Sequence, residues 1–156
     1  MTNKITPCLW FDKEAEEAAN FYVSIFNNSR IDTISRYGKE GFEIHGQQEG
    51  TVLTVSFQIN GQPFTALNGG PIFKFNEAIS FQVYCETQNE IDRYWSKLTE
   101  GGEESQCGWL KDKYGVSWQI VPKILPHLLS DPKRADKVTK AFLKMKKFNI
   151  EELLKA

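Results

Sequence analysis

Three features are missing from this sequence of 156 residues: a long apolar run, closely spaced cysteines and an excess of charge of either sign. A membrane-spanning helix needs roughly 18 or more consecutive apolar residues. No such stretch occurs, so we expect no membrane span and no membrane partner. Met1 leads directly into polar residues rather than a basic and then apolar leader, which predicts that there is no signal peptide and that the protein is cytoplasmic.

The cysteines and the charges exclude two further classes. Cys8, Cys85 and Cys107 cannot all pair within one chain and lack the spacing of a zinc site, so reduced thiols are expected. The net charge of −1, from 19 basic and 20 acidic residues, gives no field that favours nucleic acid. Residues 133–147 hold seven basic side chains and one acidic one, a pattern typical of a solvated helix face, with an acidic partner as the alternative.

The first half of the chain has an ordered series of strand and helix patterns. A strand over 5–11 is followed by Asp12 as a candidate N-cap and by an amphipathic helix over 13–27. Strands are predicted over 31–36, 42–45 and 51–59, the last with strict alternation of apolar and polar residues. Asn60-Gly61 then predicts a tight hairpin into a return strand, Pro63 to Leu67.

The second half repeats this order. Alternating residues over 79–84 predict a strand, and Thr87 with Glu90 forms a capping box that opens a helix. Gly101-Gly102 ends that helix, and a hairpin follows over 106–121 with its turn at 111–115. We therefore expect one globular domain built from a module at 3–69, a second module at 77–122 and C-terminal helices at 123–156.

Four runs of the sequence are distinctive: Ile5-Thr6-Pro7-Cys8-Leu9-Trp10-Phe11-Asp12, Cys107-Gly108-Trp109-Leu110-Lys111-Asp112, Tyr114-Gly115-Val116-Ser117-Trp118-Gln119-Ile120-Val121-Pro122 and Lys144-Met145-Lys146-Lys147-Phe148. They resemble the PhnB-like proteins, a branch of the vicinal oxygen chelate superfamily of glyoxalases, bleomycin-resistance proteins and extradiol dioxygenases. Some of these proteins carry the family name 3-demethylubiquinone-9 3-methyltransferase. The resemblance implies an α+β fold of paired βαβββ modules, usually completed by homodimerisation.

The resemblance also implies where a divalent metal would be held. Enzymes of the superfamily use four His or Glu side chains on the first and last strands of the two modules, and these positions fall on Thr6, Thr65, Ala78 and Gln119. None of these side chains is the imidazole or carboxylate that such an ion requires, and a shift of one residue brings in only Glu77. We therefore predict no metal and no other cofactor.

The same strand alternation indicates a binding face for a small molecule. Uncharged polar and aromatic side chains would share one concavity, which is the usual composition of a small-molecule pocket. The alternative is that they pack in a dimer seam, and Trp109 and Trp118 are expected in the core. The predicted ligand-binding residues are Thr6, Cys8, Trp10, Thr65, Ser80, Gln82, Tyr84, Ser117 and Gln119.

The functional hypothesis is a PhnB-like homodimer that binds a small molecule without the superfamily metal, and we assign no catalytic residue. One alternative is a metal-dependent enzyme of glyoxalase or dioxygenase type, with Glu77, His45 or Glu43 as ligands. A second alternative is an interaction module with a filled cavity. Methyl transfer is suggested by the family name alone. The residues do not predict a nucleotide methyl-donor site, because no glycine-rich turn follows the first strand and Gly69-Gly70-Pro71 does not open a helix.

Overall fold

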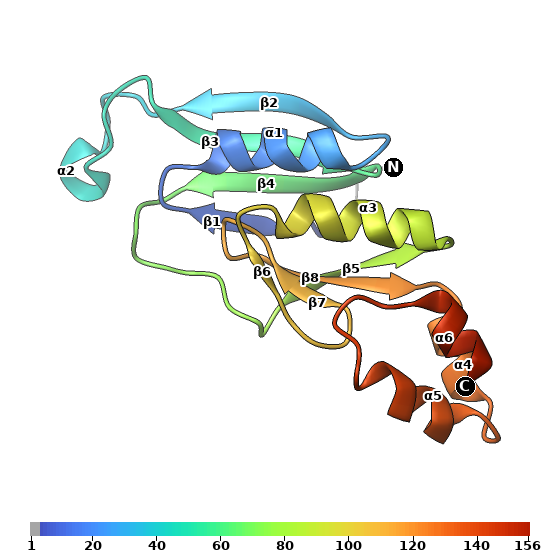
Figure 1. Ribbon diagram of the computed structural model, residues 1–156. Helices are drawn as coiled ribbons and strands as arrows, with labels where there is room; N and C mark the ends of the chain where they lie inside the picture. Colours follow the sequence, from blue (N-terminus) through green and yellow to red (C-terminus); the bar gives the residue numbers. More distant parts are fainter. Residues whose placement is uncertain (1–3) are drawn as a thin grey trace. The chain divides into compact units, whose positions relative to one another are not determined.

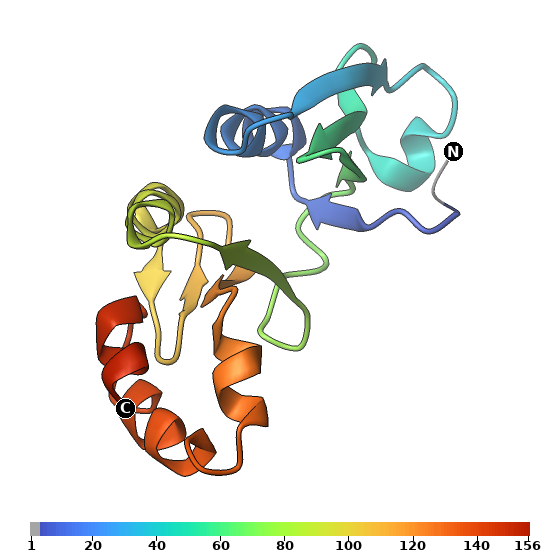
Figure 2. The same cartoon turned by 90° about the vertical axis from the view of Figure 1, so that its right-hand side faces the viewer.

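The computed structural model describes residues 4–156 and confirms the predicted α+β fold (Figure 1). The chain divides into two compact units, Met1–Lys74 and Phe75–Ala156. Each unit holds a four-stranded sheet with a helix on one face, and Figure 2 shows these two helices nearly end-on beside their sheets. Below, the opposite face of each sheet is called its open face.

The first unit follows the predicted order of strand, helix and further strands. Its sheet has the order β1-β4-β3-β2, with β1 parallel to β4 and the other neighbours antiparallel. Its elements are β1 (Cys8–Phe11), α1 (Ala15–Ile25), β2 (Arg30–Arg36), α2 (Phe42–His45), β3 (Val52–Ile59) and β4 (Gln62–Asn68).

Strict alternation along β3 produces the core of this unit. Val55 and Phe57 are fully buried and Ile59 nearly so, on the face that α1 covers with Tyr22. The predicted Asn60-Gly61 hairpin is confirmed: both residues have the positive φ angles, 48° and 78°, that a tight turn between antiparallel strands requires.

Two local predictions in this unit are wrong. The helix begins at Ala15, not after Asp12, and the acceptor for the Ala15 N–H is Oδ1 of Asn68, at 2.8 Å, from the end of β4. The segment predicted as a strand at 42–45 is the short helix α2. It lies between Gly41 and Gly46, both with left-handed φ angles, which close a single helical turn.

The second unit repeats the sheet and adds three helices. Its sheet has the order β5-β8-β7-β6, and β5 is parallel to β8 as β1 is to β4. The Thr87–Glu90 capping box is confirmed at the start of α3. The elements are β5 (Ser80–Cys85), α3 (Gln88–Thr99), β6 (Glu103–Glu104), β7 (Trp109–Lys111), β8 (Ser117–Pro122), α4 (Leu125–Ser130), α5 (Ala135–Phe142) and α6 (Ile150–Lys155).

The C-terminal segment docks on its own unit. Phe148 is 2% exposed. A Cβ on Gly108, the residue before β7, would lie 2.4 Å from the Phe148 ring, so only glycine fits at position 108. The Gln88 side chain donates to the carbonyl of Phe148 and accepts from the N–H of Ile150. Among residues 4–156, no helix is both long and apolar enough to cross a membrane.

Asp112 organises the hairpin between β7 and β8. Its carboxylate is 3% exposed and accepts hydrogen bonds from the N–H groups of Tyr114 and Val116, at 2.9 and 3.1 Å, and from the Trp118 indole, at 2.9 Å. A buried carboxylate is tolerated when donors satisfy it, and here the donors come from the turn and from the start of β8. The Asp112 side chain thus adds to the backbone hydrogen bonds that Asp112 makes with Gly115 and Val116 across the predicted turn at 111–115.

We expect Asp112→Ala to lower the free energy of unfolding by about 3 kcal/mol, because it leaves buried donors without an acceptor. Asp12→Ala, at an exposed position, is the matched control and should change it by no more than about 0.5 kcal/mol. Urea denaturation followed by tryptophan fluorescence gives both values. Equal losses for the two variants would contradict this role of Asp112.

Candidate functional site

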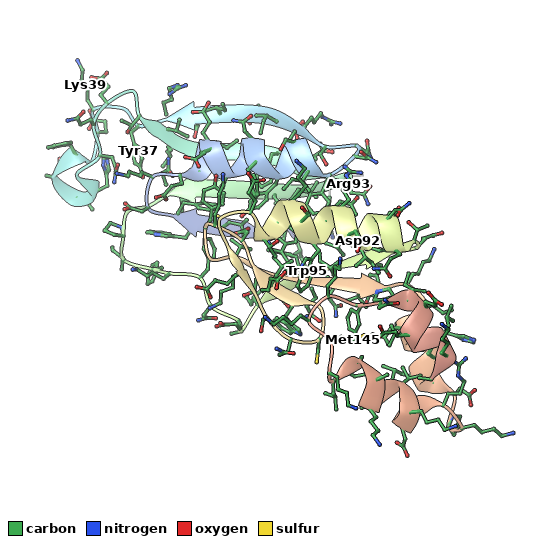
Figure 3. All side chains as sticks on the ribbon, viewed as in Figure 1. Tyr37, Lys39, Asp92, Arg93, Trp95 and Met145 are labelled. Carbon is green, nitrogen blue, oxygen red and sulfur yellow. The ribbon has the colours of Figure 1, made fainter. Side chains whose placement is uncertain are left out.

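The open face of the second sheet carries most of the predicted binding residues. Trp118 and Ile120 of β8 point toward α3 and are buried, so their neighbours Ser117 and Gln119 point to the other face. Figure 3 shows Trp95 on the side of α3 that faces the sheet, where its indole donates to Glu104. Ser80, Gln82 and Tyr84 of β5 lie beside β8 on the open face.

Four of these side chains form a continuous hydrogen-bonded series, which we call the polar chain: Tyr84, Gln82, Gln119 and Ser80. The Tyr84 hydroxyl donates to Oε1 of Gln82 at 3.1 Å, and Nε2 of Gln82 donates to Oε1 of Gln119 at 3.4 Å. Nε2 of Gln119 then donates to the Ser80 hydroxyl at 2.8 Å. The polar chain is uncharged, and its amides offer both donors and acceptors to an incoming group.

A charged region adjoins the polar chain on the same face. Lys111, opposite Ser117 in the sheet, forms an ion pair with Glu77. The hydrogen bond from Lys111 lowers the pKa of Glu77, and the same bond raises the pKa of Lys111. A cavity of about 120 Å³ lies here, which we call the edge cavity; its lining includes Glu77, Glu103, Glu104, Trp109, Lys111 and Ser117.

The open face of the first sheet carries the other predicted residues. Cys8 lies opposite Thr65, and Thr6 lies exposed before β1 begins. Trp10 is half-buried: its indole N–H donates to the carbonyl of Gly70 at 2.8 Å, and its ring packs edge-on against Phe73 with 4.9 Å between the centroids. The polar group of Trp10 is therefore already engaged within the protein.

No thiol is activated at either sheet. Partial burial raises the pKa of the Cys8 thiol above its ordinary value. Burial, with a smaller contribution from the Glu90 carboxylate, raises the pKa of Cys85 to about 12. Because the thiolate is the nucleophile, both groups are mainly in the unreactive protonated form near neutral pH.

The observed register shows which side chains lie opposite two of the expected metal-ligand positions, Thr65 and Gln119. Gln82, not Ala78, lies opposite Gln119, and Cys8, not Thr6, lies opposite Thr65. Hydroxyl, thiol and amide groups at these positions do not fit an ion that selects imidazole and carboxylate. Within residues 4–156, no three His, Cys, Asp or Glu side chains come together in a metal-binding arrangement.

His45, one of the alternative ligands, holds a loop together. Its Nδ1 accepts from the N–H of Gln47 at 2.9 Å, its Nε2 lies 3.1 Å from the carbonyl of Glu40, and its ring contacts Tyr37. Both ring nitrogens are therefore occupied by backbone groups. His127, the other histidine, lies exposed in α4.

Sequence reasoning missed one aromatic residue of the site. Trp118 is buried as predicted, but Trp109, which was also expected in the core, is half-buried and lines the edge cavity. Cross-strand pairing would have placed Trp109 on the open face, because Trp109 lies opposite Gln119 and directly opposed residues share a face.

Comparison with known proteins gives one family and several solved structures. The model of the family described as 3-demethylubiquinone-9 3-methyltransferase matches residues 3–121. A putative 3-demethylubiquinone-9 3-methyltransferase, PhnB protein, from Bacillus cereus is 42% identical with a TM-score of 0.68, covering 77% of this chain and 99% of its own. No curated protein matches.

Two more distant structures share the fold. The protein PA1353 from Pseudomonas aeruginosa has a TM-score of 0.59 at 17% identity, covering 75% of this chain and 95% of its own. The fosfomycin resistance protein FosX from Listeria monocytogenes has a TM-score of 0.54 at 18% identity, covering 84% and 99%. At these identities the likeness concerns architecture alone.

Proposed function

Because the chain belongs to the 3-demethylubiquinone-9 3-methyltransferase family, a PhnB-like branch of the vicinal oxygen chelate superfamily, we propose that it binds a small molecule without the superfamily metal. The observation that carries this proposal is the polar chain. Gln82 and Gln119 hydrogen-bond to each other on the two strands where superfamily enzymes place metal ligands. Amides there orient a neutral polar group and do not coordinate an ion.

Most of the proposed binding residues lie on the open faces of the two sheets; Thr6 precedes β1, and Ser117 is 1% exposed beneath the carbonyl of Asn76. The uncharged donors and acceptors suit a ligand with a hydroxyl or amide group, and the half-exposed ring of Tyr84 suits an apolar or aromatic part. The residues are Thr6, Cys8, Trp10 and Thr65 in the first unit, and Ser80, Gln82, Tyr84, Ser117 and Gln119 in the second.

Two reactions suggested by relatives are not part of the proposal. A metal-dependent reaction needs ligands such as Glu77 or His45, but Lys111 pairs with the first, and backbone groups occupy both ring nitrogens of the second. Methyl transfer from a nucleotide donor normally uses a glycine-rich turn between a parallel strand and the next helix. Here those connections are Asp12-Lys13-Glu14 and Glu86-Thr87.

We also propose that the protein is a homodimer, as the family resemblance implies, and that it works in the cytoplasm. In sedimentation equilibrium the mass should be twice the 17.9 kDa of the chain, independent of concentration over the micromolar range. A mass of a single chain throughout that range would contradict the dimer.

Ligand binding is tested most directly at the centre of the polar chain. Gln119→Met removes the amide and keeps the side-chain length. We expect neutral aromatic amides, with benzamide as the first probe, to raise the melting temperature of the wild-type protein. The variant should bind them about tenfold more weakly, because it loses both hydrogen bonds that the amide offers.

The matched control is Gln48→Met, at an exposed position outside both open faces, which should leave the shift unchanged. Equal melting-temperature shifts for wild type and Gln119→Met would contradict binding at the polar chain. The absence of any shift across a panel of neutral amides and phenols would favour the filled-cavity alternative.

A further inference from the structure

We propose that the edge cavity binds the ammonium group of a small amine-bearing ligand. This inference rests on the proposed ligand-binding role of the open face and adds a chemical class to it. The cavity, about 120 Å³, has room for roughly four molecules of water at about 30 Å³ each, or for a short organic chain.

The strand register places the cavity next to the polar chain. Glu103 of β6 lies opposite Lys111 of β7, and Lys111 lies opposite Ser117 of β8, so these side chains form one row across the open face. Trp109 and Gln119 form the adjacent row. A ligand that extends from the edge cavity past Trp109 would therefore approach the amide of Gln119.

The balance of charge in the cavity favours a cation. The carboxylates of Glu77 and Glu103 face the single ammonium of Lys111, which forms its ion pair with Glu77. Glu103 raises the pKa of Lys111 but has no ion pair of its own among residues 4–156. One carboxylate is thus left over, which attracts an ammonium group and repels a ligand carboxylate.

Glu104 does not change this balance. Its carboxylate accepts from the Trp95 indole at 2.7 Å and lies 3.9 Å from the ammonium of Lys146, so it is already compensated. Trp109 adds a second element of recognition. Its half-buried indole lines the cavity, and the face of an indole ring attracts an organic cation.

Lys111 acts as an internal competitor in this arrangement. Its ammonium already occupies the position beside Glu77 that a ligand's ammonium would take. Removing that charge should free a second carboxylate for the ligand. Substitutions of Glu103 and Lys111 are therefore expected to act in opposite directions. A general effect of net charge would have the same signs, so the specific effect is separated from it by a charge change outside the cavity.

Four probes of matched size separate the possible ligand chemistries: propylamine, β-alanine, propionate and propanamide. Ligand-observed NMR at pH 7 and low salt measures their binding to the full chain. Propylamine should bind and propionate should not. β-Alanine binding as well as propylamine indicates a zwitterionic ligand, whereas propylamine binding alone indicates a simple amine; either result supports the ammonium site.

The variants locate the site. Glu103→Gln should weaken propylamine binding about tenfold, and Lys111→Met should strengthen it several-fold. Glu100→Gln, which removes the same charge from an exposed position outside the cavity, should leave binding within a factor of two. Circular dichroism melts of each variant confirm that it is folded before binding is compared.

Several outcomes overturn the inference. Binding of propionate or propanamide without propylamine contradicts an ammonium site but leaves the proposed ligand binding intact. Equal weakening of propylamine by Glu103→Gln and Glu100→Gln shows a general charge effect and also contradicts it. If all four probes fail while benzamide binds, the inference alone fails; if benzamide fails too, the proposed function fails with it.

Discussion

In each unit, the first and last strands in chain order, β1 with β4 and β5 with β8, pair in parallel, and this pairing decides which side chains meet on the open faces. It brings Gln82 beside Gln119 in one unit and Cys8 beside Thr65 in the other. A helix covers the opposite face of each sheet with apolar side chains, so alternation places the polar residues on the face away from that helix. A metal site, a binding face or a packed seam in this fold has to be made from what those paired positions supply.

In this chain they supply neutral groups. The Gln82 amide donates to the Gln119 amide, which donates to Ser80, and both keep lone pairs and N–H groups for another partner. Several carboxylates at the same place would repel one another unless a cation joined them. On the second sheet, charge lies at the border of this neutral region, where Lys111 and Glu77 meet near Trp109. A neutral centre with an acidic border suits a ligand with distinct polar ends.

Features set by neighbours in the chain were predictable from the sequence. The Asn60-Gly61 hairpin and the Thr87–Glu90 capping box depend on two and four residues, and both are confirmed. The start of α1 was not predictable, because its first N–H is capped by Asn68, 53 residues away. The turn of α2 depends on two glycines with left-handed φ angles. Because glycine adopts positive and negative φ angles about equally well, the sequence alone does not say which conformation it takes.

Which of the predicted binding residues share a face was predictable to the extent that strand alternation determines it. Alternation along β5 and β8 puts five of them on one face: Ser80, Gln82, Tyr84, Ser117 and Gln119. The place of Trp109 and the pairing of Gln82 with Gln119 depend instead on the strand register, which a single sequence does not determine.

The central claim is that these paired positions hold no divalent metal, and metal content tests it most directly. Protein purified without chelators is analysed for Zn, Ni, Mn and Fe by mass spectrometry, before and after equilibration with each ion and gel filtration. The account predicts far less than one equivalent of any metal per chain, unchanged in Glu77→Gln. Close to one equivalent per chain, lost in that variant, would contradict it.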